Sequence, residues 1–104
     1  MAKQSEKVID RYTDAEALED GFLVAVNEPP VNRVTRAVFD QFSNPIGAPP
    51  AVVIDITPLL KVIRTMLTIE ADADGWRVGE YEGAKLWLIP NEVGGLTLMF
   101  PEDY

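Results

Sequence analysis

The segment ITPLLKVIRTMLTIEA, residues 56–71, constrains the fold of this chain more than any other. Its apolar residues are so frequent that a helix built from them would be apolar around most of its circumference. Thr57 is suited to the N-cap and Pro58 to the first helical position. Since a helix of this kind is stable only when it is buried, we expect residues 58–71 to form the central core helix. Its narrow polar edge would carry Lys61, Arg64 and Thr68.

The hydrophobic pattern changes near Asp72 from a helical period to alternation, which is the period of a strand. Three β-like runs follow, WRVGEY (76–81), AKLWLI (84–89) and LTLMF (96–100), and turn-forming residues separate them. They predict an antiparallel three-stranded meander. Its middle and last strands have few polar positions, so a helix should cover one face of the sheet.

The stretch YTDAEALEDG predicts a short helix over residues 14–20. Thr13 and Glu16 have the spacing of a capping box, and Gly21 stands where a helix end favours a left-handed residue. A short strand should follow at 22–26.

The next segment, VNRVTRAVFDQF, predicts a second helix with two alternative starts. The helix begins near Val31 or, if residues 31–34 are extended, with Thr35 as its N-cap. Beyond it, SNPIGAPP at 43–50 is a Pro-rich internal loop.

We therefore expect an α+β fold in which helices pack on the C-terminal meander, with a short N-terminal strand. The chain has 104 residues, which suits one domain spanning 1–104. The loop at 43–50 is the only candidate linker, and it would lie within that domain.

The chain contains neither cysteine nor histidine. Their absence excludes thiol nucleophiles, zinc–thiolate sites and every Ser-His or Cys-His dyad. We therefore expect a protein that is not an enzyme and uses no cofactor. The rival interpretation is a carboxylate-based hydrolase or divalent-metal binder, built on pairs such as Glu80 with Glu82 or Asp72 with Asp74.

The stretch EADADG, residues 70–75, resembles the first half of a calcium-binding loop. The second half does not fit, because Arg77 and Tyr81 stand where an aliphatic residue and a closing glutamate are needed. A solvated turn between helix and strand is the favoured interpretation.

From charge and hydropathy we expect a cytoplasmic protein; the resemblance described below implies that the cytoplasm is that of a host cell. The N-terminal stretch MAKQSEKVIDRY has no apolar core for a signal peptide, and no window is apolar enough to cross a membrane. Seventeen acids against nine bases give a formal charge of −8, which disfavours nucleic acid and anionic membranes and favours basic partners.

The acids are concentrated in residues 10–28 and 70–82, whereas residues 31–64 are mildly basic. Glu19 and Asp20 oppose the macrodipole at the end of the first helix, which marks either a binding surface or an acid satisfied locally. In the second interpretation Asp20 accepts backbone hydrogen bonds or pairs with Arg33 or Arg36.

The aromatic residues of the last third have two interpretations. They form a binding platform, or they belong to the core, which is the commoner fate of aromatic residues on amphipathic strands. Without interleaved basic residues they do not suit nucleic-acid stacking. The residues concerned are Trp76, Tyr81, Trp87 and Phe100.

Three blocks of the chain resemble a family of small proteins of unassigned function encoded by phages, plasmids and other mobile elements. The blocks are YTDAEALEDGFLVAV, VTRAVFD and LTLMFPEDY, and they occur in the family's order. The chain departs from the family at 90–95, where the family tends to carry a Gly-Pro-Gly-Asp turn. The positions that carry the resemblance are Tyr12, Thr13, Ala17, Asp20, Gly21, Leu23, Val26, residues 35–38 and residues 101–103.

The resemblance implies a protein of a mobile element, and small acidic proteins of this kind often block host machinery. We expect it to bind and inhibit or modulate a host complex that handles nucleic acid, for example a restriction nuclease or a CRISPR-type effector. Acidic blocks would occupy the basic groove in which the partner binds DNA. Alternatively, the protein is a structural homo-oligomer that dimerises through an exposed edge of the meander. The expected partner-binding residues are Asp14, Glu16, Glu19, Asp20, Glu102, Asp103 and Tyr104.

Overall fold

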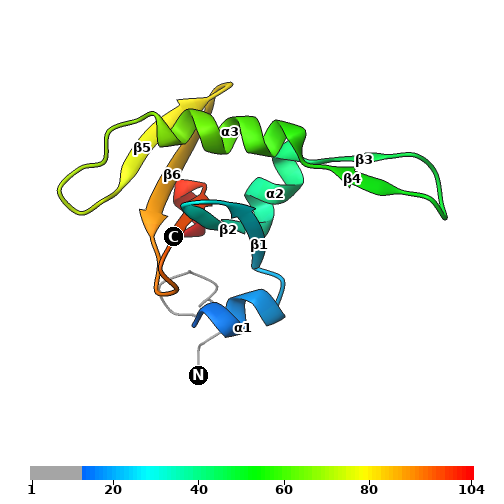
Figure 1. The fold of residues 1–104 in the computed structure, drawn as a ribbon, viewed down its shortest axis with the longest axis horizontal. Coiled ribbons are helices and arrows are strands. Elements are labelled where there is room, and N and C mark those ends of the chain that lie inside the picture. Colours follow the sequence, from blue (N-terminus) through cyan, green and yellow to red (C-terminus); the bar gives the residue numbers. More distant parts are fainter. Residues whose placement is uncertain (1–12) are drawn as a thin grey trace.

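The computed structural model describes residues 13–104 and has an α+β architecture with a mixed five-stranded sheet and a separate two-stranded sheet (Figure 1). Of the three α-helices in the described residues, one precedes the first strand and two lie between strands, and a 3-10 helix follows the last strand. The predicted α+β class is confirmed. In chain order the elements are α1 (Asp14–Glu19), β1 (Leu23–Glu28), β2 (Val31–Thr35), α2 (Arg36–Phe42), β3 (Asn44–Ile46), β4 (Val53–Asp55), α3 (Thr57–Leu67), β5 (Arg77–Tyr81), β6 (Ala84–Pro90), β7 (Leu96–Met99) and η3 (Pro101–Asp103).

The five-stranded sheet has the order β1-β2-β7-β6-β5 and joins both ends of the described chain. β1 and β2 form an antiparallel pair, and β2 then pairs in parallel with β7, with Val34 beside Leu98. β7, β6 and β5 are antiparallel neighbours, and Leu88 of β6 lies opposite Leu98. The predicted short N-terminal strand is therefore part of a hairpin built into the same sheet as the C-terminal strands.

α3 and α2 cover one face of this sheet. The main core lies between these two helices and the sheet, where α3 residues such as Ile63 and Met66 pack against Leu86, Leu88 and Leu98. Gly79 of β5 lies against the side chains of Met66 and Ile69, with which a Cβ would collide. Glycine at this position therefore lets β5 approach the end of α3 closely.

α1 and the C-terminal turn η3 belong to the other side. In Figure 1, α1 lies on the opposite side of the sheet from α3. Ala17 of α1 is fully buried, as is Met99 of β7, and Leu23 and Ile89 are nearly so. These residues form a smaller apolar layer beneath the site described below.

Most predicted elements are confirmed, although several bounds differ. The capping box of Thr13 and Glu16 is present in α1. Thr35 is the N-cap of α2, so the later of the two predicted helix starts is correct and residues 31–35 form a strand. The core helix is shorter than the predicted 58–71.

Thr57 is not the N-cap of α3, contrary to the prediction. Ile56 holds that position and makes no side-chain cap, while the Thr57 N–H donates to Oδ1 of Asp55 at 3.0 Å. Asp55, two residues before Thr57, supplies the acceptor that the threonine was expected to provide.

Residues 43–50, predicted to be a loop, include strand β3. β3 and β4 form an antiparallel hairpin, with Pro45 opposite Ile54 and Ile46 opposite Val53. We call this hairpin, residues 44–55, the arm; it extends away from the rest of the molecule (Figure 1). The prolines suggested a loop, but an edge strand tolerates a residue without an N–H.

No helix within residues 13–104 is both long and apolar enough to cross a bilayer. The expected lack of a signal peptide rests on residues 1–12, which lie outside the described residues. Tyr12, the first position of the family resemblance, lies there too.

Candidate functional site

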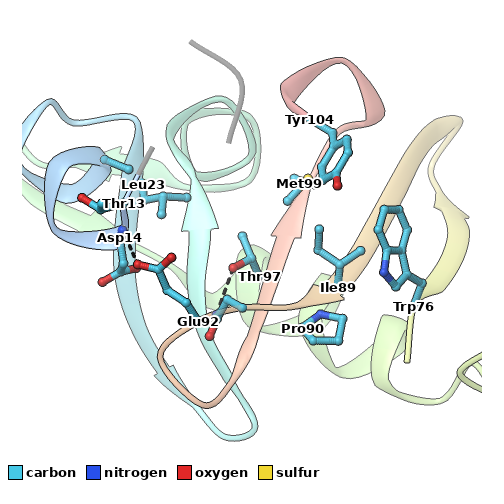
Figure 2. Close-up of a pocket in the computed structure, with 12 residues that line it drawn as sticks. Thr13, Asp14, Leu23, Trp76, Ile89, Pro90, Glu92, Thr97, Met99 and Tyr104 are labelled. Atoms are coloured by element: carbon cyan, nitrogen blue, oxygen red, sulfur yellow. Dashed lines mark hydrogen bonds between the residues drawn. The ribbon is translucent and has the colours of Figure 1, made fainter. Parts of the chain in front are cut away.

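A pocket of about 310 Å³ lies between the start of α1, the turn joining β6 to β7, and the C-terminal residue. Asp14 and Glu92 stand at one end of the pocket, and Trp76 and Tyr104 at the other (Figure 2). Its volume is at the lower limit for ligand pockets in proteins. The described residues that line it are Thr13, Asp14, Ala17, Leu23, Trp76, Ile89, Pro90, Asn91, Glu92, Thr97, Met99 and Tyr104.

Asp14 is held by Arg33 of β2 in a two-pronged ion pair. Arg33 Nε donates to Oδ1 at 2.8 Å and the other guanidinium nitrogen, Nη2, donates to Oδ2 at 2.9 Å. The two side chains are only 16% and 11% exposed, and the hydrogen bonds to Asp14 raise the pKa of Arg33. This geometry fixes the start of α1 on the sheet and neutralises the Asp14 charge.

Glu92 contributes the carboxylate that faces the pocket without a cationic partner among the ion pairs of residues 13–104. One carboxylate oxygen accepts from the Asp14 backbone N–H at 2.8 Å, and the side chain is exposed. Glu92 was not among the residues predicted from the sequence. Nothing in the turn PNEVGG signals it, because its role arises only when α1 packs beside that turn.

Asn91 shapes the same turn. Its side-chain oxygen accepts from the N–H groups of Val93 and Gly95, while its amide nitrogen donates to Asn32 and to the Thr97 hydroxyl. The turn is thus tied to both β2 and β7. This network holds Glu92 in place beside α1.

The far wall of the pocket is aromatic. Trp76, Trp87 and Tyr104 form a cluster with ring centroids 5.3–5.8 Å apart. Tyr81 and Phe100 instead pack on Phe42, on the side of α2 and α3. The predicted aromatic group is therefore split between the pocket and the main core.

Asp103 has a structural role. Its Oδ2 accepts from the Thr35 hydroxyl at 2.7 Å and from the Phe100 N–H at 3.1 Å. The same hydroxyl accepts from the Val38 N–H at the start of α2. Two blocks that carry the family resemblance, residues 35–38 and 101–103, meet in this network.

The structure brings only two of the seven predicted partner-binding residues to the pocket, Asp14 and Tyr104. The others lie outside its lining. Four of these are exposed: Glu16, Glu19, Asp20 and Glu102.

The idea that Asp20 pairs with Arg33 or Arg36 is wrong. Arg33 pairs with Asp14, and Arg36 pairs with Asp40 at 3.6 Å. Asp20 is the C-cap residue of α1, with its backbone N–H bonded to α1 carbonyls. Both arginines therefore pair with acids other than Asp20, which the sequence alone did not indicate.

The calcium-like stretch forms a turn. Asp72 Oδ1 accepts from the N–H groups of Asp74 and Trp76, at 2.8 and 3.0 Å. Within residues 13–104, no group of three or more Asp or Glu side chains is placed to hold a metal ion.

Chemically, the pocket combines a carboxylate, an apolar floor and aromatic rings, and no basic residue is among its described lining residues. Such a site suits a cation on an apolar stem, because the carboxylate attracts the charge and the apolar floor contacts the stem. Comparison with protein-family models, curated proteins and solved structures gives no match for this chain.

Proposed function

We propose that this protein is a non-enzymatic binding protein that engages the cationic surface of a partner protein. The observation that carries the proposal is the pocket with Glu92 at one end and the rings of Trp76 and Tyr104 at the other, with no basic residue among the described lining (Figure 2). A lysine or arginine side chain of the partner fits it, with its stem on Ile89 and Met99 and its charge beside Glu92.

Unpaired negative charge supports the same proposal. Arg33, Arg36 and Arg64 each pair with one acid in the described part of the chain. The exposed acids of α1 and the C-terminal turn take part in none of those pairs, and such charge speeds encounter with a basic surface. These acids, which we call the rim, are Glu16, Glu19, Asp20 and Glu102.

The proposed partner is a host complex that handles nucleic acid, a restriction nuclease or a CRISPR-type effector, and the bearer is a phage or plasmid. Such enzymes hold DNA in grooves lined with lysine and arginine. An acidic domain occupying that groove would compete with DNA directly. The resemblance to proteins of mobile elements points to this class of partner.

The test is affinity capture from a bacterial lysate, followed by titration of the purified basic protein that is recovered. DNA should compete with the chain for that protein, and binding should weaken as salt rises. The rim variant carries Glu16→Gln, Glu19→Gln, Asp20→Asn and Glu102→Gln.

The matched control removes the same number of charges from exposed positions elsewhere: Glu70→Gln, Asp74→Asn, Glu80→Gln and Glu82→Gln. The rim variant should lose association rate, and the control should keep it. Equal losses would show that only net charge matters, and recovery of no basic partner would contradict the proposal.

The pocket is tested separately by Glu92→Gln and Tyr104→Leu. Each should weaken binding about tenfold or more, about 1.4 kcal/mol, chiefly through faster dissociation. Unchanged affinity in both variants would remove the pocket from the interface while leaving the rim to be judged by its own variant.

A further inference from the structure

The arm is the most exposed apolar feature of the described chain. Every residue from 44 to 54 is exposed. Ile46 and Val53 lie opposite each other and so share one face, while Pro45 and Ile54 share the other. Val53 is 63% exposed and Ile54 50%, so both faces carry uncovered aliphatic side chains.

A two-stranded ribbon of three-residue strands is marginal by itself in water. Its apolar faces do not pack on the main core, which contains no residue of the arm. Exposed aliphatic groups concentrated in one projecting element indicate a surface that becomes covered in an assembly.

The near absence of charge in the arm argues against a strongly charged partner. Residues 43–54 contain no charged side chain, although a quarter of the chain is charged. A basic partner would find no acid along this stretch, and a nucleic acid or anionic membrane would find no cation. A second copy of the chain, also at −8, is repelled by the rest of the surface but not by the uncharged residues 43–54.

The arm also suits a symmetric contact. In a two-fold dimer the same patch meets itself, which requires a surface complementary to its own copy. Uncharged aliphatic faces satisfy this condition without opposite charges. β3 carries Pro45, which has no N–H, so β4 is the better edge for pairing between copies.

We infer that the arm is a self-association element through which two copies of this chain dimerise, the aliphatic side chains of Val53 and Ile54 being covered by the partner copy. This differs from dimerisation through the sheet edge, which β5 would provide. It does not depend on the proposed binding of a basic partner.

The test is sedimentation velocity over a concentration series at low and high salt. The wild-type chain should pass from monomer to dimer, and added salt should strengthen the dimer by screening the like charges of the two bodies. Binding of a basic partner would respond to salt in the opposite direction. A wild-type chain that stays monomeric at its highest concentration overturns the inference.

The arm variant is Val53→Ser with Ile54→Ser. Its matched control is Val78→Ser with Val93→Ser, which removes two exposed aliphatic side chains, 57% and 41% exposed, from β5 and the β6–β7 turn. The arm variant should be monomeric where the control still dimerises. A dimer that survives in the arm variant but not in the control would assign the interface to β5 or the turn and overturn the inference.

A second measurement distinguishes loss of the arm contact from unfolding of the variant. The chain has no cysteine, so Ile54→Cys introduces a single thiol. Oxidation should give a covalent dimer from this variant more than tenfold faster than from Val78→Cys. Equal rates would contradict an arm contact, and circular dichroism confirms that both variants are folded.

Discussion

The pocket end of the molecule and the arm differ in almost every physical respect. The pocket is concave, carries carboxylates and aromatic rings, and is held by hydrogen bonds from β2, β7 and the C-terminal turn. The arm is convex, uncharged over residues 43–54, and held to the body mainly at its base. One region suits a charged ligand, and the other suits an apolar surface.

This difference shows why unpaired charge and exposed apolar surface should be considered separately in a small acidic domain. Both sites leave favourable contacts unmade, but salt acts on them in opposite directions. We expect contacts at the pocket to weaken as salt rises, and contacts between the uncharged parts of two arms on acidic bodies to strengthen. A single salt titration thus separates the two sites.

Among substitutions that compare the pocket with the arm, the largest change in the free energy of unfolding is expected at Met99. It is fully buried and lines the pocket, so Met99→Ala should lower the free energy of unfolding by about 2–5 kcal/mol. Ile54→Ala on the arm should change it by less than about 0.5 kcal/mol in dilute solution. Urea unfolding measures both, and a loss at Ile54 as large as that at Met99 would mean that the arm is packed on its own body.

The next effect concerns the ion pair that fixes α1. Arg33→Gln leaves Asp14 with little solvent and no cation, and should cost about 1.5–3 kcal/mol. Arg64→Gln is the control, because Arg64 also bonds one acid, Glu28, at 2.7 Å but is 62% exposed. The control should have a small, salt-dependent effect, and similar losses in both variants would show that burial does not strengthen the Asp14 pair.

A somewhat smaller effect is expected where α2 is joined to the C-terminal turn. Thr35→Val removes the buried hydroxyl between Val38 and Asp103, at a cost of about 1–3 kcal/mol. Thr68→Val is the control, since that hydroxyl is exposed and bonds only a carbonyl of its own helix. Combining Thr35→Val with Asp103→Ala should cost less than the sum of the two, and strict additivity would show that the two side chains act independently.

Local signals in the sequence predicted the helices and the C-terminal strands well. The capping box at Thr13, the apolar pattern of α3 and the alternation of β6 act over a few residues, so they are visible without the fold. The parallel pairing of β2 with β7 joins Val34 to Leu98, which are far apart in the sequence. No local pattern encodes such a contact.

The candidate site was harder to predict for the same reason. Acidic composition drew attention to α1 and the C-terminal residues, and Asp14 and Tyr104 do line the pocket. It could not separate Asp14 and Asp103, which bond within the fold, from the exposed acids. Glu92 joins the site only through the backbone of Asp14. The strands of the arm were not predicted, because its prolines are as typical of loops as of edge strands.

The smallest effect on stability is expected at Asp55, at the base of the arm, and it depends on pH. Hydrogen bonds from the backbone N–H and the hydroxyl of Thr57 lower the pKa of Asp55 below its ordinary value of 3.8. The folded state therefore favours the ionised carboxylate, so the stabilisation is complete above the ordinary pKa and is lost as pH falls through the lowered one. The difference in unfolding free energy between wild type and Asp55→Asn should be present at about pH 6 and shrink below about pH 4. Urea titrations across that range measure it, and a difference that grows on acidification would contradict the hydrogen bonds that join the arm to α3.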